Sequence, residues 1–424
     1  MAEGSQAFGM KQRLFLEEIC SDILRCLHPR DLATPGRDIR IDHEWNLGSG
    51  TEFADIRVRP SDADPYFVEI KVGYTNGEVV RRLADKFSSE DGRRGGAQKV
   101  VVVLDMRGRR ERDELVRAIR SAIARSLDVE LWDEDALDAL TQRFFGVRLP
   151  PLDDPSAVAP FRMAVDEAKA RWAFGERSVA TDRPLRDALL WRFGVSQLKE
   201  LRGANAAKGL PETAESLVPM GHYERAIVLM ADMSSFSSFV RDTPDEEITR
   251  ASLTSFYAKS REQIIDSGGM FYQFVGDEVS AIFGVPNARP GYVHDALRAA
   301  RALLEILRSV TTHWQRRIDR VQAHCAAHIG MAMGDLDLVA LRPFDVARFG
   351  AFGDSLNIAA RLLHVAAADE IIISNVLRQE LDGLAYDCEL RPETEIKNLG
   401  VVRSWRLIAD AGARDRAGVA PGAH

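Results

Sequence analysis

Two acidic turns in the second half of the chain have the residue types and spacing of a divalent-metal site. An apolar run that starts at Ala226 ends on Asp232, and Asp277 lies 45 positions later, directly after a glycine. The segments on either side of that turn, 270–275 and 278–283, are rich in β-branched and aromatic residues. They predict a β-hairpin with Asp277 at its tip. A strand ending in Asp232 beside this tip would bring together two carboxylates, the ligands that hard divalent cations prefer.

A third polar pattern follows further along, where Gly353 and Asp354 precede a helical periodicity. Asp354 or Ser355 is suited to cap the N-terminus of this helix. Asn357 and Arg361 are four positions apart, so their side chains share one helix face. An amide and a fixed cation on one face can orient a ribose oxygen and stabilise charge that develops on a phosphoryl group.

In this order, the apolar run ending in aspartate, the Gly-Asp hairpin and the Asn-x-x-x-Arg helix resemble the catalytic domain of class III nucleotide cyclases, the adenylate and guanylate cyclase family. The resemblance covers residues 223–409 and implies an α+β fold with a ferredoxin-like core and an antiparallel sheet. It implies that Asp232 and Asp277 bind two divalent ions, Mn²⁺ or Mg²⁺. It assigns Asn357 and Arg361 as the catalytic pair that orients the ribose and stabilises the transition state.

The resemblance also implies a partner chain and contacts to the triphosphate. In the family, the metal ligands and the Asn/Arg pair that face one substrate come from different chains, so a homodimer with two composite sites is expected. The loop after the first aspartate offers backbone N–H groups to the triphosphate, and here it comprises Met233, Ser234, Ser235 and Phe236. Ser235 replaces a glycine that is usual in the family. Lys397 matches a lysine that binds the triphosphate in some members.

The positions that read the base depart from the purine-specific patterns of the family. Gln273 stands where adenylate cyclases carry a lysine, and Gly350 stands where they carry an aspartate or threonine. Four aromatic residues flank these positions: Tyr272, Phe274, Phe349 and Phe352. A bulky, stacking pocket favours a one-ring base over a two-ring base. The alternative is that the aromatic residues pack in the core, and we favour this interpretation for Phe274 and Phe352.

This departure, together with the N-terminal region described below, resembles the pyrimidine cyclases of bacterial antiphage defence, the Pycsar type. That resemblance implies conversion of UTP to cyclic UMP, a second messenger. Three alternatives remain open: a cytidylate cyclase, a purine cyclase with an atypical base pocket, and a nucleic-acid-binding or nuclease protein with a degenerate cyclase domain.

Composition narrows the class of protein. A chain of 424 residues is long enough for two or three domains. Its net charge of −8 argues against a general nucleic-acid binder. The segment 71–125 nevertheless contains 14 Lys or Arg against 8 Asp or Glu, so nucleic acid stays a candidate partner of the N-terminal region.

Membrane and redox signals both favour a cytoplasmic protein. We find no apolar run near the roughly 18 residues of a membrane span. The four cysteines lack metal-ligand spacing, which is typical of free thiols in a reducing compartment; they are Cys20, Cys26, Cys325 and Cys388.

Residues 1–150 carry the alternating pattern of an α/β domain. Helices are predicted at 11–27, 78–87 and 110–126, and strands at 39–46, 53–59, 65–72, 99–105 and 129–132.

Asp55, Glu69 and Lys71 stand at the ends of two of these strands, and Glu69 follows Asp55 by 14 positions. They resemble the motif of the PD-(D/E)xK restriction-endonuclease-like fold, with Glu17 or Glu18 as a candidate fourth member. In that family the acids bind a metal and the lysine positions the attacking water. Such a combination also arises by chance, and we expect this domain to sense or assemble rather than to cut.

The remaining segments complete the domain plan. Residues 151–222 are predicted as a helical linker, with helices at 157–174 and 184–201, and residues 410–424 as a flexible tail. In the cyclase region, helices are predicted at 234–240, 246–267, 292–313 and 354–367, and strands, besides the hairpin, at 323–333, 348–352, 370–373 and 386–396.

Overall fold

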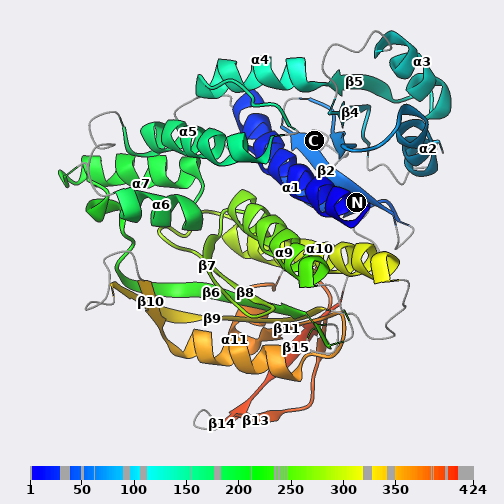
Figure 1. Ribbon diagram of the computed structural model, residues 1–424. Coiled ribbons are helices and arrows are strands. Elements are labelled where there is room, and N and C mark those ends of the chain that lie inside the picture. Colours follow the sequence, from blue (N-terminus) through cyan, green and yellow to red (C-terminus); the bar gives the residue numbers. More distant parts are fainter. Residues whose placement is uncertain are drawn as a thin grey trace, which may run out of the picture.

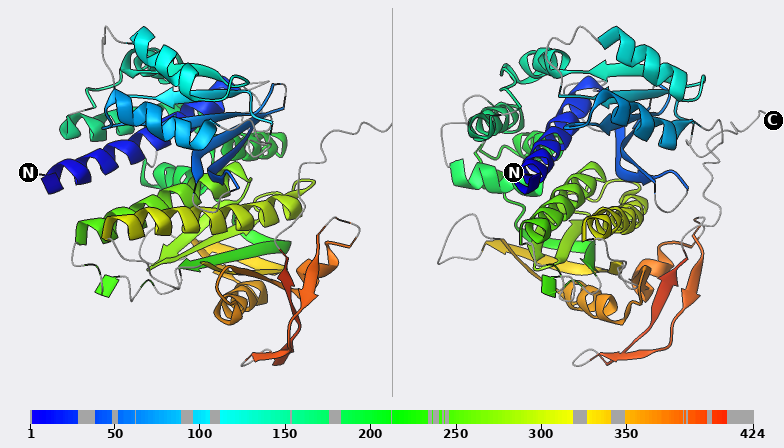
Figure 2. Two further views of the ribbon diagram at one scale, coloured as in Figure 1. Left: turned by 90° about the vertical axis from the view of Figure 1, so that its right-hand side faces the viewer. Right: turned by 45° about the vertical axis from the view of Figure 1, so that its right-hand side comes forward.

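The computed structural model describes residues 2–28, 39–48, 52–61, 63–88, 96–105, 112–152, 154–175, 183–211, 213–233, 236, 240–241, 243, 246–318, 327–340, 349–382, 384, 386–396 and 400–408. Two units that each contain a β-sheet are stacked on one another, with helices filling the space between the two sheets (Figures 1 and 2). Within the described ranges, no helix has the length and apolar character needed to cross a membrane.

The N-terminal unit is built on a five-stranded mixed sheet with the strands in sequence order. The strands are β1 (Ile39–Asn46), β2 (Phe53–Pro60), β3 (Tyr66–Ile70), β4 (Lys99–Val103) and β5 (Asp128–Trp132). The first three pair antiparallel and the last three parallel. All of these strands were predicted.

Helices cover both faces of this sheet. On one face lie α1 (Ala2–Leu27) and α4 (Glu134–Phe145), and on the other α2 (Asn76–Phe87) and α3 (Arg112–Ala122). Strand β4 is buried on both sides, because Val101 faces the α1 core and Val100 the α2 core. A strand buried on both faces explains its uninterrupted valine run. Helix α4 was not predicted.

Three linker helices follow: α5 (Pro155–Phe174), α6 (Arg183–Arg192) and α7 (Val195–Ala207). The single helix predicted over 184–201 is wrong, because the chain breaks at Gly194, the N-cap of α7. A Cβ atom at Gly194 would come within 2.8 Å of the Ile265 side chain, so glycine permits this close approach. Apolar residues of α6 and α7 share a core with the second sheet. A short 3-10 helix, η2 (Glu215–Leu217), precedes that sheet.

The second unit begins with a β-α-β-β-α-β order: β6 (Gly221–Met233), α9 (Glu246–Asp266), β7 (Met270–Val275), β8 (Glu278–Phe283), α10 (Tyr292–Ile318) and β9 (Ala327–Ala340). The four strands are arranged β9-β6-β8-β7 and all pair antiparallel. This is the topology of a ferredoxin-like core, as the sequence predicted.

Four more strands of the main sheet and two helices follow β9 in the described chain. They are β10 (Phe349–Phe352), α11 (Asp354–Val365), β11 (Glu370–Ser374), α12 (Asn375–Gln379), β12 (Cys388–Leu390) and β15 (Ser404–Leu407). Strands β11, β15 and β12 continue the sheet beyond β9, and β10 pairs with β9. Strand β11 pairs parallel with β9, so the expectation of a purely antiparallel sheet is wrong. The single strand predicted over 386–396 is also wrong: β12 joins the main sheet, whereas β13 (Thr394–Ile396) forms a separate hairpin with β14 (Gly400–Val402).

The two faces of the second sheet carry different helices. Helices α9 and α10 cover the face toward the N-terminal unit, and α11 covers the opposite face (Figure 1). Along β6, Leu229 and Ala231 belong to the core under α9 and α10, whereas Val228 and Met230 belong to the core on the other face. This alternation buries β6 on both sides, which explains its continuous apolar run.

Charged residues join the two units across a buried interface. Helix α1 and strand β1 pack against α9 and α10. Arg25 Nε lies 2.8 Å from Asp266 Oδ1. The Lys259 ammonium contacts both Glu17 and Glu44, and all three side chains are more than nine-tenths buried. Because a buried charge without a partner is costly, these pairs fix how the two units meet.

Candidate active site

The two predicted carboxylates lie together at one end of the second sheet. Asp232, near the end of β6, is opposite His328 of β9. By the alternation along β6, its side chain falls on the α11 face. Asp277 occupies the two-residue turn closed by the Val275–Glu278 pair, where Gly276 has a φ of +63°. The two carboxyl groups lie close enough to share a hydrogen bond.

Electrostatics favour a cation between these carboxyl groups. Burial, and then the negative charge of Asp232, raise the pKa of Asp277 to about 6. Burial also raises the pKa of Asp232. A divalent cation would relieve both effects, so the pair fits the metal ions that the sequence implied. Within the described ranges no three His, Cys, Asp or Glu side chains converge, so such an ion would take its other ligands from backbone, water or phosphate oxygens.

Tyr257 on α9, which the sequence did not single out, holds the hairpin tip. Its hydroxyl donates a hydrogen bond to the Gly276 carbonyl oxygen. Its ring stacks on Phe274 with 4.4 Å between centroids. The contact spans 19 positions along the chain, and no local pattern marks it. Helix α9 therefore sets the position of the turn that carries Asp277.

Two glycines allow helix α11 to pack closely against β9. A Cβ atom at Gly330 would lie 2.3 Å from the Ala359 carbonyl oxygen, and one at Gly353 would lie 2.4 Å from that of Asp335. The predicted cap at Asp354 or Ser355 is wrong: Gly353 is the N-cap and no side chain caps the helix. The Ser355 hydroxyl instead donates to the Asp335 carbonyl oxygen at 3.2 Å.

Asn357 and Arg361 lie on the outer side of α11, with exposed side chains. The helix face against the sheet is formed by Ala359 and Leu363, which contact Gly330. Neither polar side chain makes a hydrogen bond or ion pair with the described residues. The two therefore share a face, as predicted, and are presented to solvent.

The two base-reading positions lie on strands that do not pair with each other, since β7 pairs with β8 and β10 pairs with β9. Gln273 is exposed on the edge strand β7, and Gly350 is buried on β10. The adjacent residues connect these strands, because the Ala351 N–H donates to the Tyr272 hydroxyl oxygen at 3.0 Å.

The interpretation that Phe274 and Phe352 pack in the core is wrong. Their side chains are 46% and 54% exposed, respectively. Phe274 lies on the edge strand β7 and its ring stacks on Tyr257, whereas Tyr272, two positions before it on the same strand, is buried. The side chain of Phe349 lies outside the described residues.

The predicted triphosphate loop is only partly described. The Met233 side chain is buried in the core under α9 and α10, and Phe236 packs against that core. The Met233 N–H is hydrogen-bonded to Asp232. Ser234, Ser235 and Lys397 lie outside the described residues.

In the N-terminal unit, Asp55, Glu69 and Lys71 do come together, and all three are buried. Lys71 Nζ lies 3.2 Å from Asp55 Oδ2 and 2.5 Å from Glu69 Oε2. Two further cations close the group: Lys86 lies 2.8 Å from Glu69 and Arg13 lies 2.9 Å from Asp55. The strands therefore bring the predicted triad together around cations of the protein itself.

This ion-paired arrangement does not fit a metal centre. Burial opposes ionisation of Asp55, but the surrounding cations, Lys71 above all, hold its pKa well below its usual range. Its Oδ2 atom also accepts a hydrogen bond from the Ile70 N–H at 2.7 Å. Of the two candidate fourth members, Glu17 pairs with Arg13, whereas Glu18 pairs with Arg162. The carboxylates that a nuclease would offer to a metal are thus occupied by side-chain cations.

Comparison with known proteins identifies the second unit. Residues 218–409 match the family model of the adenylate and guanylate cyclase catalytic domain. Atrial natriuretic peptide receptor 2 of Homo sapiens is 26% identical over 193 residues, which are 44% of this chain and 18% of the receptor. An uncharacterized protein of Mycobacterium tuberculosis is 26% identical over 172 residues, 40% of this chain and 30% of that protein. The chain thus matches less than a third of the length of these relatives.

Two solved structures are each similar over 45% of the chain. The adenylyl cyclase CyaB from P. aeruginosa is 18% identical, with a TM-score of 0.41, over 45% of this chain and 96% of that one. The guanylate cyclase domain of RhGC from Catenaria anguillulae, solved in complex with GTP, is 19% identical, with a TM-score of 0.39, over 45% of this chain and 98% of that one. Because residues 218–409 match this family model, they are a catalytic domain of the class III adenylate and guanylate cyclase type.

Proposed function

We propose that this protein is a nucleotide cyclase that converts UTP to 3′,5′-cyclic UMP and pyrophosphate. The observation that carries the proposal is the Asp232–Asp277 carboxyl pair at the hairpin tip of a cyclase-type domain.

The reaction closes a ring within the nucleotide. The ribose 3′-oxygen forms a bond to the α-phosphorus while the bond to the β-phosphate breaks, pyrophosphate leaves, and the 3′-hydroxyl proton passes to solvent. Two divalent ions, Mn²⁺ or Mg²⁺, held by Asp232 and Asp277, would acidify the 3′-hydroxyl and neutralise the leaving pyrophosphate. Holding both reacting atoms in line supplies much of the rate enhancement.

Asn357 orients the ribose and Arg361 stabilises the charge that develops at phosphorus. Their exposed position on α11 supports the view that they serve a substrate held by a second chain. In a homodimer each site would combine the carboxyl pair of one chain with the Asn/Arg pair of the other. Met233 to Phe236 and Lys397 complete the proposed triphosphate contacts.

The preference for a pyrimidine rests on the base-reading positions. Gln273 and Gly350 offer neither the lysine and aspartate nor the glutamate and cysteine that read purines in the family. The exposed rings of Phe274 and Phe352 lie on the same two strands as these positions and offer stacking surface, in Phe274 on the face turned away from Tyr257. The alternatives are CTP or a purine, and the match to the adenylate and guanylate cyclase family model keeps the purine alternative in the test.

We assign the cyclic nucleotide the role of a second messenger in bacterial antiphage defence, by the Pycsar resemblance. In this proposal the restriction-endonuclease-like N-terminal domain (1–150) senses a signal or supports assembly, the linker (151–222) connects it to the catalytic domain (223–409), and 410–424 is a tail. The occupied state of Glu69 and Lys71 supports sensing over cleavage.

The experiment is direct competition. Purified protein is incubated with equimolar ATP, GTP, CTP and UTP plus Mn²⁺, and the products are separated by mass. We expect cyclic UMP to dominate. Predominance of another cyclic nucleotide refutes the base assignment but keeps the cyclase, whereas absence of every cyclic product from folded dimer refutes the cyclase itself.

A further inference from the structure

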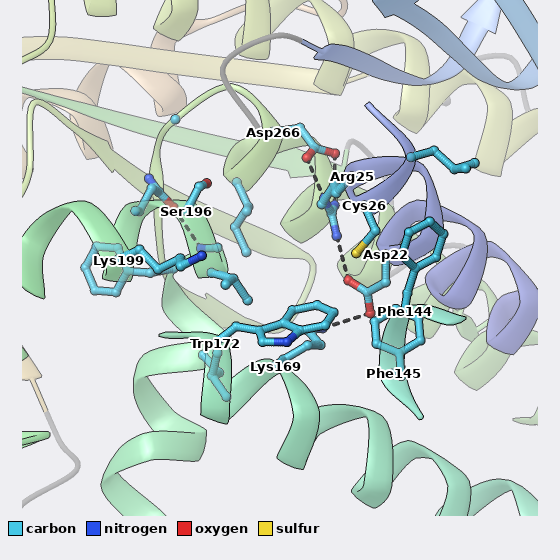
Figure 3. A pocket seen from close by; sticks show the side chains of 18 of the residues that line it. Asp22, Arg25, Cys26, Phe144, Phe145, Lys169, Trp172, Ser196, Lys199 and Asp266 are labelled. Carbon is cyan, nitrogen blue, oxygen red and sulfur yellow. Dashed lines mark hydrogen bonds and ion pairs between the residues drawn. The ribbon is translucent and has the colours of Figure 1, made fainter. Parts of the chain in front are cut away.

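A cavity of about 680 Å³ lies where the three parts of the chain meet, away from the carboxyl pair. Its walls come from α1 and α4 of the N-terminal unit, from α5 and α7 of the linker, and from the end of α9 (Figure 3). The volume is within the usual range of small-molecule sites, which occur preferentially at such junctions. No sequence motif marks the cavity, because its lining residues are spread from Asp22 to Arg289.

Positive side chains outnumber negative ones around the cavity. Its acids are Asp22 and Asp266, and its basic residues are Arg25, Arg143, Lys169, Lys199, Arg261 and Arg289. Three acids just outside the lining offset most of this charge: Glu262 contacts Arg25 and Arg261, Glu200 contacts Arg289, and Asp166 lies 3.8 Å from Lys169. An excess of positive charge remains, and it favours an anionic ligand.

The N-terminus of α7 adds to this preference. Gly194, Val195 and Ser196 line the cavity. The Gly194 N–H donates to Gln197 Oε1 at 2.8 Å, but Gly194 itself has no side chain that could accept from the next N–H groups of α7. The N–H groups of Val195 and Ser196 at the start of this 13-residue helix, with Lys199 one turn later, form a favourable environment for a phosphate group. In Figure 3, Ser196 and Lys199 lie on one side of the cavity and Arg25 and Asp22 on the other.

Aromatic rings form another part of the wall. Trp172, Phe144 and Phe145 line the cavity, and the Trp172 and Phe145 rings lie 5.5 Å apart. Trp172 is drawn between the two polar sides in Figure 3. Such rings offer stacking surface to a flat heterocycle.

We propose that this cavity binds a nucleoside monophosphate or a phosphorylated molecule of that size, with its phosphate at the N-terminus of α7 and its ring against Trp172. The combination of a phosphate-binding helix terminus, surplus cations and an aromatic wall matches the two halves of a nucleotide. The site is separate from the one in which the triphosphate substrate is cyclised.

The cavity is also connected to the catalytic hairpin. Gln197 Nε2, from the lining, donates to the Gly269 carbonyl oxygen at 3.1 Å, directly before β7. Ile265, also in the lining, lies on α9, the helix that carries Tyr257. A ligand in the cavity would therefore contact α9 directly and would be linked to the start of β7 through Gln197. This regulatory consequence rests on the proposed cyclase function, whereas binding does not.

Binding is tested by calorimetric titration of the full-length protein with 5′-UMP, 5′-CMP, 5′-AMP and 5′-GMP in EDTA, which withholds the metal ions that the catalytic site requires. We expect saturable binding of at least one monophosphate with one site per chain. The charge-reversed variant Arg143→Glu/Lys199→Glu should lose at least about tenfold in affinity, since each position contributes a charge-assisted contact.

Lys208→Glu, an exposed position at the end of the same helix, is the matched control and should bind as wild type does. Thermal unfolding of each variant verifies the fold. The proposal is overturned if no monophosphate saturates the protein at millimolar concentration, or if the double variant binds as tightly as the control. Absence of cyclase activity in the competition assay would not affect the binding of monophosphates measured in EDTA. The proposed cyclase function and the proposed cavity ligand can therefore be refuted independently.

Discussion

At the scale of single residues, the site depends on two acids that repel each other. Asp232 and Asp277 lie within hydrogen-bonding reach, and burial together with mutual repulsion keeps the pKa of Asp277 near 6. Removing a residue from such a pair relieves the repulsion, so the folded protein should tolerate the change even though the chemistry does not.

We therefore expect Asp232→Ala and Asp277→Ala each to abolish cyclisation, by about a thousandfold or more, since either change removes a metal ligand. The midpoint of thermal unfolding should stay at or above that of wild type. Asp335→Ala, an exposed acid on β9, is the control and should retain activity. Rates near wild type for either site variant, under saturating Mn²⁺, would remove the metal assignment.

At the scale of elements, the close packing of α11 against β9 determines where Asn357 and Arg361 lie. The backbone atoms of Ala359 and Leu363 approach the position of a Gly330 Cβ atom to 2.3 Å, which leaves no room for even a methyl group. The helix position is thus set by the absence of a side chain on the strand beneath it.

Gly330→Ala should push α11 off the sheet, destabilise the protein by about 1–3 kcal/mol and lower the cyclisation rate. Gly203→Ala is the matched control, because nothing lies within 4 Å of its Cβ position on α7. The control should be neutral or stabilising by about 0.5–1 kcal/mol. Urea unfolding of both variants measures the difference, and equal midpoints would contradict the packing argument.

Local patterns in the sequence predicted most elements, because the hairpin, the apolar strands and the helix of Asn357 each have a short-range periodicity. What they missed depends on distant contacts. The break at Gly194 follows from the approach of Ile265, and the bracing of Gly276 follows from Tyr257 on another element. The exposure of Phe274 could not be predicted, since a hydrophobic residue on an edge strand fits either environment.

At the scale of the whole molecule, ion pairs connect the two units. Burial opposes ionisation of Asp266 and Glu262, but the Arg25 cation outweighs it and lowers the pKa of both carboxyl groups. A lowered folded-state pKa contributes stability that is present above the unfolded value, about 4, and is lost as the pH falls through the folded-state value.

Urea titrations between pH 7 and pH 3 should show this linkage. Asp266→Asn should be less stable than wild type at pH 7, and the difference in unfolding free energy should shrink below about pH 4.5 as the wild-type carboxylate becomes protonated. A difference that stays constant across this range would show that Asp266 contributes through packing rather than charge.

The buried group in the N-terminal unit leads to a separate expectation. Glu69→Ala and Lys71→Ala each leave buried charges unpaired and should destabilise by about 3–5 kcal/mol, without changing the cyclase rate of the folded fraction. Lys99→Ala removes an exposed pair with Glu130 and should cost no more than about 1 kcal/mol. Metal-dependent cleavage of DNA or RNA by wild type, lost in Lys71→Ala, would show that the unit is a working nuclease.

Mixing two inactive variants tests the composite site. A heterodimer of Asp277→Ala with Arg361→Ala contains one site with both lesions and one with neither. Free exchange of chains gives about half heterodimer, so about a quarter of the original sites should regain activity. Each variant alone should stay at background. If an exchanged mixture shows no cyclase activity although tagged pull-down confirms heterodimers, the shared site is refuted. The same result would weaken the roles assigned to Asn357 and Arg361.

The ion pairs between the units also impose an order of events during synthesis. Arg25 leaves the ribosome 241 positions before its partner Asp266, and Glu44 leaves 215 positions before Lys259. At a translation rate of about 5–20 residues per second, roughly 10 to 50 seconds pass between the synthesis of these residues and that of their partners. During this time the surface of α1 and β1 that will later be buried carries hydrated charges. These charges oppose aggregation of the nascent N-terminal unit with other chains. The same charges that fix the finished interface thus protect the unfinished one.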